Sequence, residues 1–77
     1  MRINRHAVTA IRTRSGLTKS ALARLAGCGA PTISDIEAGR RTASPDLIAR
    51  IAAALKVPLV AILADPNGDT NGDEAVA

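Results

Sequence analysis

The sequence predicts a single all-α domain built from five short helices. A chain of 77 residues is too short to form two independent cores. Apolar residues make up 47% of the chain and none is aromatic, so the core must come from Leu, Ile, Val and Ala, which suits short helices in close contact. Helix start and stop signals recur along residues 1–64. We therefore expect one domain over residues 1–64, followed over residues 65–77 by a disordered acidic tail of turn-forming residues.

The first two helices have N-terminal capping residues. Asn4 is placed to cap a helix over residues 5–14, and the hydroxyl of Thr18 is placed to cap a second helix over residues 19–26. Helical periodicity turns one large and two small apolar residues of the second helix toward the core, namely Leu22, Ala23 and Ala26.

The third helix is predicted over residues 30–38. Pro31 falls in its first turn, where proline is tolerated, and Gly39 suits the left-handed conformation that ends a helix. Steps of 100° per residue place Ile33 and Ile36 inward. The opposite side then carries small or polar residues, namely Pro31, Ser34, Asp35 and Ala38.

The fourth and fifth helices are each introduced by a proline. A hydroxyl, a proline and an acid at residues 44–46 predict the start of a helix that ends at Leu55, and Pro58 opens a short fifth helix through about Ala64. The fifth helix has no polar face, so a second subunit is expected to cover the side turned away from the core, although simple exposure is the alternative. The predicted dimer interface consists of Leu59, Val60, Ile62 and Leu63.

Positive charge is confined to the predicted domain. All ten Lys and Arg residues lie at or before Lys56, so residues 1–64 carry 10 − 3 = +7, whereas the remaining residues carry −4. Such a field suits a polyanionic partner, although a solubilising surface gives the same count.

Composition excludes several classes of protein. Without aromatic rings the chain cannot stack on unpaired bases, which argues against single-strand and RNA-recognition modules. Cys28 is the only cysteine and His6 the only histidine, so we expect no intramolecular disulfide, no metal site, no cofactor and no nucleophilic enzyme mechanism. No apolar run approaches a membrane span and the N-terminus lacks a secretory signal, so a cytoplasmic location is expected.

The second and third helices suggest how the chain meets its partner. They are joined by the short turn Gly27-Cys28-Gly29, and the third exposes a slender face of small residues that can enter a DNA major groove about 12 Å wide. The stretch from Gly16 to Gly39 closely resembles the helix-turn-helix of the Cro and lambda-type repressor family, also called the Xre family. The residues that carry the resemblance are Gly16-Leu17-Thr18-Lys19, Leu22, Ala23, Gly27, Thr32-Ile33-Ser34 and Ile36-Glu37-Ala38-Gly39.

The resemblance covers residues 5–64 and implies a five-helix, lambda-repressor-like domain with its helix-turn-helix at the second and third helices. It also implies that Arg12 pairs with Glu37. The chain departs from the family pattern at Gly29, where the cap is usually a hydroxyl residue, and at Leu25 with Ala26, which reverse the usual order of large and small residues.

Similar proteins meet base edges with the first, second and sixth residues of the third helix, which here are Ala30, Pro31 and Asp35. Asp35 either accepts a hydrogen bond from a cytosine amino group or pairs with a neighbouring arginine. The full set of expected base contacts is Ala30, Pro31, Thr32, Ser34, Asp35 and Arg41. The expected phosphate contacts are Lys19, Arg40, Ser44, Arg14, Arg24 and, as the alternative to its base contact, Arg41.

These expectations define a sequence-specific regulator of double-stranded DNA. The favoured interpretation is a homodimeric transcriptional repressor of phage or bacterial origin that binds an inverted repeat and is associated with the nucleoid. The alternative is an antitoxin that represses its own operon and neutralises a toxin by direct protein contact.

Overall fold

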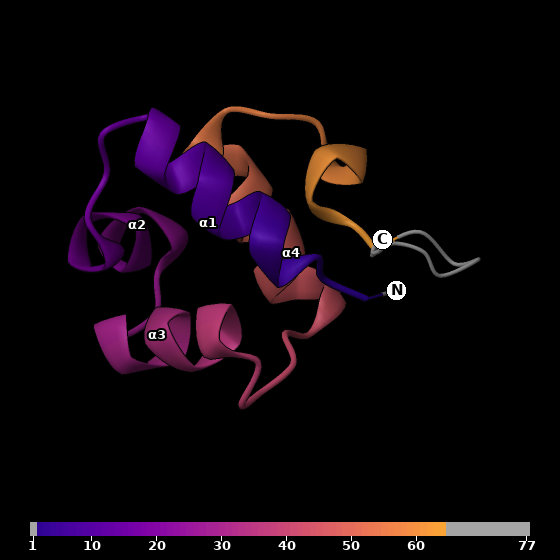
Figure 1. Cartoon of the computed structure of the whole chain (residues 1–77), viewed down its shortest axis with the longest axis horizontal. Coiled ribbons are helices and arrows are strands. Elements are labelled where there is room, and N and C mark those ends of the chain that lie inside the picture. The colour runs from indigo at the N-terminus through magenta and orange to yellow at the C-terminus, as the bar shows by residue number, and fades with distance from the viewer. Residues whose placement is uncertain (1, 65–77) are drawn as a thin grey trace, which may run out of the picture.

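The computed structural model describes residues 2–64, which form four α-helices and one short 3-10 helix (Figure 1). The elements are α1 (Arg5–Arg14), α2 (Lys19–Ala26), α3 (Ala30–Ala38), α4 (Pro45–Leu55) and η1 (Leu59–Ile62). The all-helical class and the bounds predicted for the first four helices are confirmed. The acidic tail predicted over residues 65–77 lies outside the described residues. None of the helices in residues 2–64 combines the length and the apolar content that a membrane span requires.

Hydroxyl and amide side chains cap three of the helices at their N-termini, as the sequence predicts. Asn4 accepts a hydrogen bond from the amide of Ala7 at 3.1 Å and caps α1. Thr18 and Ser44 cap α2 and α4 through the third amide after each of them, at 3.0 and 3.2 Å. Each bond satisfies an amide that the helix leaves free, which stabilises the helix by about 1 kcal/mol. The N-cap of α3 is Gly29, which has no side chain to provide such a bond.

Left-handed residues end three of the helices. Gly27 after α2 and Gly39 after α3 have φ of 76° and 81°, and for Gly39 this agrees with the left-handed conformation predicted from the sequence. Lys56 closes α4 with φ of 60°, and it is the only residue other than glycine with a positive φ within residues 2–64. A side chain at this position strains the backbone, because its Cβ approaches the following carbonyl oxygen.

The fifth predicted helix is a single 3-10 turn of four residues and not an α-helix through Ala64. Leu63 returns to extended backbone and forms an antiparallel bridge with Ile3. The amide of Asn4 donates to the carbonyl of Ile62 at 2.8 Å, and the amide of Ala64 donates to the carbonyl of Arg2 at 2.8 Å. This pairing of the two ends of the domain draws the chain out of the helix after one turn.

The core is aliphatic and lies where α2, α3, α4 and η1 meet beneath α1. In Figure 1, α4 passes behind α1, while α2 and α3 occupy one end of the domain and η1 the other. α2 packs against both α3 and α4, and α1 packs against α3 and η1. The buried residues are Val8, Leu22, Ala23, Ala26, Ile33, Ile36, Ile48, Ile51, Ala52, Leu55 and Ile62.

The burial of Ile62 corrects the predicted dimer interface. Its side chain is 0% exposed and belongs to the core of the domain itself, so it is not available to a second subunit. Val60 is 73% exposed, whereas Leu59 and Leu63 are half-buried. A 3-10 turn has three residues per turn, so it points Leu59 and Ile62 to the same side and Val60 away from them.

Candidate nucleic-acid interface

The turn between α2 and α3 is short and closely hydrogen-bonded. The left-handed Gly27 redirects the chain, and the amide of Cys28 donates to the carbonyl of Ala23 at 2.9 Å. Gly29 is extended and begins α3, which packs against α2. Ala23 is buried, so a larger side chain there has no space. The turn therefore holds the two helices in one defined relative orientation.

α3 has a buried face and a face made of small side chains. Ile33 and Ile36 are completely or almost completely buried and attach the helix to the core, as predicted. Pro31 and Ala38 are exposed. The other residues that we expected to meet base edges from this helix are half-buried, namely Ala30, Thr32, Ser34 and Asp35. The outer face of α3 is therefore slender, with no long side chain of its own.

Arg40 folds back onto α3 and pairs with Asp35. Its Nε donates to Oδ1 of Asp35 at 3.0 Å, and its Nη2 lies 2.9 Å from the same oxygen. The sequence leaves two roles open for Asp35, and in the free protein this carboxylate lies against a neighbouring arginine. The two side chains are 64% and 37% exposed, and pairs this exposed contribute only about 0–1 kcal/mol. Either partner can therefore exchange this contact for another one at little cost.

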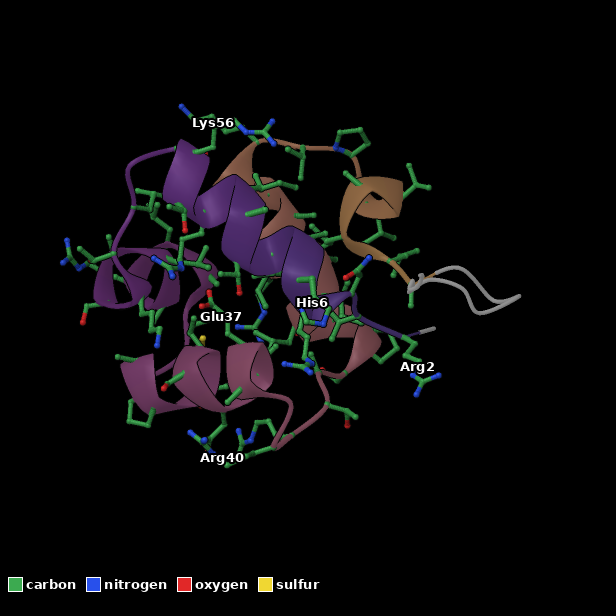
Figure 2. All side chains as sticks on the ribbon, in the orientation of Figure 1. Arg2, His6, Glu37, Arg40 and Lys56 are labelled. Carbon is green, nitrogen blue, oxygen red and sulfur yellow. The ribbon has the colours of Figure 1, made fainter. Side chains whose placement is uncertain are left out.

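Arg41 also lies along α3. Its Nη1 donates to the hydroxyl of Thr32 at 3.4 Å, which places the guanidinium beside the N-terminal half of the helix. Two guanidinium groups from the segment after Gly39 thus flank a helix that carries no Lys or Arg itself. Figure 2 shows Arg40 on the outer side of α3, away from α1.

Arg12 and Glu37 form a bidentate ion pair between α1 and α3. Arg12 Nε donates to Glu37 Oε2 at 2.7 Å, and Arg12 Nη2 donates to Oε1 at 3.1 Å. The third guanidinium nitrogen, Nη1, donates to the carbonyl of Leu17 at 2.8 Å. The side chains are only 14% and 6% exposed, so this pair is largely shielded from water. In Figure 2, Glu37 lies between α1 and α3. The pair ties the orientation of α3 to α1 and to the entry of α2.

Two further arginine contacts were missed by sequence reasoning. Arg5 Nη1 donates to the carbonyl of Glu37 at 3.2 Å, and Arg50 Nη1 donates to the carbonyl of Gly27 at 3.4 Å. Arg5 belongs to α1 and binds the C-terminal end of α3, whereas Arg50 belongs to α4 and binds the C-terminal end of α2. For α3 the available signal was the absence of any basic residue in its last turn, which leaves the negative end of the helix dipole without a local cation.

The other predicted phosphate-binding residues lie at the ends of three different helices, and all of them are exposed. Lys19 begins α2 and Ser44 caps α4, and both residues are exposed. Arg14 and Arg24, in the last turns of α1 and α2, are also exposed. Next to Ser44, the exposed Asp46 is paired with an arginine of α4 at 3.1 Å, which reduces its repulsion of an anion. Within residues 2–64 there is no group of three or more metal-ligating side chains.

The family of the chain follows from its sequence and agrees with this geometry. The chain belongs to the helix-turn-helix domain family, whose model matches residues 6–63. This match confirms the family resemblance seen in the stretch from Gly16 to Gly39. A search of curated protein sequences gives no significant match.

Solved structures of bacterial regulators share the fold. The restriction-modification controller protein C.AhdI from Aeromonas hydrophila is 28% identical, with a TM-score of 0.73 over 74% of this chain and 86% of that protein. The hypothetical transcription factor NHTF from Neisseria is 27% identical, with a TM-score of 0.75 over 82% of this chain and 72% of that protein. The clp gene regulator ClgR from C. glutamicum is 27% identical, with a TM-score of 0.69 over 73% of each chain.

Proposed function

We propose that this protein is a transcriptional regulator that binds double-stranded DNA by inserting α3 into the major groove, with α2 and α3 as its helix-turn-helix. The observation that carries the proposal is the outer face of α3, on which small side chains are flanked by the guanidinium groups of Arg40 and Arg41. A slender helix with cations beside it fits the major groove, which is about 12 Å wide and is flanked by phosphates. Membership of the helix-turn-helix family supports the same assignment.

Base recognition in this proposal combines apolar and polar contacts. Ala30, Pro31 and the methyl group of Thr32 pack on thymine methyl groups, while Ser34 donates or accepts a hydrogen bond. Asp35 accepts from a cytosine amino group once Arg40 turns from it to the DNA backbone. Because the Asp35–Arg40 pair is exposed, this exchange costs little. In this proposal Arg41 either makes the bidentate contact with guanine that α3 itself cannot provide or binds a phosphate.

Affinity comes chiefly from the phosphate backbone. The contacts proposed are Lys19, Arg40, Ser44, Arg14 and Arg24, together with the amides that begin α2 and α4. If a dimer neutralises roughly 6–10 phosphates, its affinity falls by about 10³- to 10⁵-fold between about 50 and 200 mM salt.

We further propose that the protein acts as a homodimeric repressor in the cytoplasm, bound to the nucleoid. Val60, with the edges of Leu59 and Leu63, offers an apolar surface that a second copy can cover. Two recognition helices then lie about 34 Å apart, which requires an inverted repeat with one helical turn between half-site centres. The names of the similar structures, a restriction-modification controller and a gene regulator, support a regulatory role.

The test is the selection of tight binders from a randomised duplex pool near physiological salt, followed by sequencing of the retained DNA. Enrichment of an inverted repeat is the expected result. Retention without enrichment contradicts sequence-specific regulation, and no retention contradicts DNA binding altogether. Copurification of the chain with a toxin encoded beside it would favour the antitoxin alternative.

The role of Arg41 can be read from the same selection carried out with Arg41→Met. A base contact predicts relaxed preference at one position of each half-site, whereas a phosphate contact predicts a uniform loss of affinity. Arg2→Met is the matched control, because it removes the same charge from an exposed position near the N-terminus. In Figure 2, Arg2 lies well apart from Arg40.

A further inference from the structure

The C-terminal half of α3 concentrates negative charge. It carries Asp35 and Glu37, and no basic residue occupies its last turn. The carbonyl end of a helix adds about half a negative charge of its own, so two acids near it are unfavourable. Compensation comes from outside the helix. Arg12 pairs with Glu37, Arg40 pairs with Asp35, and Arg5 reaches the backbone at the helix end.

Arg5 completes the cap of α3. The carbonyls of Asp35 and Ile36 accept hydrogen bonds from the backbone amides of Arg40 and Gly39 at 2.8 and 3.1 Å. The next carbonyl, that of Glu37, accepts from Arg5 Nη1 at 3.2 Å. Arg5 therefore satisfies a carbonyl that a helix end leaves without a partner within the helix.

Arg5 also packs against the turn that follows the helix. Its Nε, Cζ and Cδ atoms lie 3.0, 3.1 and 3.3 Å from the position that a Cβ would occupy on Gly39. Gly39 has φ of 81°, and this backbone turn directs residues 40 and 41 back along α3. The guanidinium of Arg5 thus contacts both the last turn of the helix and the residue that sets the direction of the chain after it.

We propose that Arg5 is a positioning residue for DNA recognition, which holds the exit from α3 so that Arg41 lies beside the outer face of the helix. Arg40 is anchored by Asp35, whereas within residues 2–64 the side chain of Arg41 makes a single long hydrogen bond, to Thr32 at 3.4 Å. Its placement therefore depends on the backbone turn against which Arg5 packs. The proposal rests on the function proposed above, because it assigns Arg5 a role in the same recognition surface.

The test is a double-mutant cycle on the full chain with the duplex enriched by selection. Arg5→Met keeps the apolar stem but removes the guanidinium, Arg41→Met removes the positioned side chain, and Arg2→Met is the control for lost charge. A base contact is worth roughly 5- to 150-fold in affinity, so partial misplacement of Arg41 predicts about a fivefold loss for Arg5→Met. In the Arg41→Met background the same substitution is expected to change affinity by less than about twofold, because coupled residues are not additive.

Two results overturn the proposal. Equal losses in both backgrounds would mean that Arg5 contacts DNA itself or acts on the fold as a whole. If Arg5→Met lowers the affinity for DNA no more than Arg2→Met does, then Arg5 acts only through its charge.

Amide hydrogen exchange in the free protein tests the structural half of the proposal without DNA. Arg5→Met is expected to speed exchange at the amides of Gly39 and Arg40, while the amide of Gly27, which closes α2 in the same way, keeps its rate. Unchanged exchange at Gly39 and Arg40 refutes the positioning role. If the wild-type chain retains no duplex, the function proposed above fails, and the exchange measurement still decides whether Arg5 holds the exit from α3.

Discussion

The ion pair between Arg12 and Glu37 offers the sharpest test of the energetics of this fold. Replacing Arg12 by Met leaves the carboxylate of Glu37, which is 6% exposed, without its charged partner. Removing one partner of a buried pair costs about 3–5 kcal/mol, because the remaining charge is neither hydrated nor paired. A domain of this size is stable by only about 3–9 kcal/mol in total. Arg12→Met is therefore expected to lose most of its stability.

Thermal unfolding followed by far-ultraviolet circular dichroism is the appropriate assay, because the chain has no Trp or Tyr for fluorescence. A loss of 3–5 kcal/mol corresponds to a decrease in Tm of about 12–40 °C in a domain of this size. The matched control is Asp46→Asn, which breaks the exposed pair between Asp46 and Arg50. That pair is worth about 0.3–0.5 kcal/mol and the dipole effect of Asp46 no more than about 1 kcal/mol, so the Tm of Asp46→Asn is expected to fall by less than about 12 °C.

The double variant Arg12→Met with Glu37→Leu separates burial of charge from packing. Exchanging a whole buried pair for apolar side chains is often neutral, so this variant is expected to regain most of the stability that Arg12→Met loses. Its affinity for the selected duplex is expected to stay low, because α3 has lost its polar link to α1. A single variant that loses no more stability than Asp46→Asn, or a double variant that is less stable than Arg12→Met, would refute this reasoning.

Three further predictions concern the core and the backbone, and each is measured by the same thermal unfolding. Ile51→Ala is expected to cost about 2–5 kcal/mol because Ile51 is fully buried, whereas Leu25→Ala, at a side chain that is 61% exposed, is expected to cost less than about 0.5 kcal/mol; equal costs would contradict the assigned core. Gly39→Ala is expected to cost at least about 1–2 kcal/mol, since φ is 81° and the added Cβ would lie 3.0 Å from an arginine side chain. Gly29→Ala, at φ of −85° and with its nearest neighbour at 3.5 Å, adds no backbone strain, and the reduced freedom of the unfolded chain offsets the poorer N-cap that alanine makes, so stability is expected to change by less than about 1 kcal/mol; a penalty at Gly29 larger than that at Gly39 would be inconsistent with these backbone angles. Lys56→Gly is expected to stabilise by about 0.5 kcal/mol, because relief of the left-handed strain exceeds the added freedom of the unfolded chain; a lower Tm would show that the Lys56 side chain contributes more than its backbone strain costs.

Local signals were sufficient to predict the boundaries of the four α-helices. Asn4, Thr18 and Ser44 act within three residues of themselves, because each side chain caps an amide on its own helix. Gly27 and Gly39 act through their own backbone angles. Such interactions depend on neighbours in the sequence, so they can be read without knowledge of the fold.

Periodicity alone was also sufficient to separate the two faces of α3. Ile33 and Ile36 are buried as predicted, because a helix rotates each residue by a constant angle whatever surrounds it. Leu25 and Ala26, which reverse the family's usual order of large and small residues, also differ in burial: Leu25 is exposed and Ala26 is buried.

Apart from the Arg12–Glu37 pair, which the family resemblance implies, only the tertiary structure decided which sequence-distant groups meet. Arg5 binds a carbonyl 32 residues away, and its side chain packs on Gly39. Ile62 is buried because the two ends of the domain pair through Ile3 and Leu63, which shortens the last helix and turns this residue into the core. The sequence determined the helices and the faces that they present, because these depend on residues a few positions apart. Their relative placement decided the contacts at the end of α3 and the extent of the apolar surface around η1, because those contacts exist only once the helices have packed.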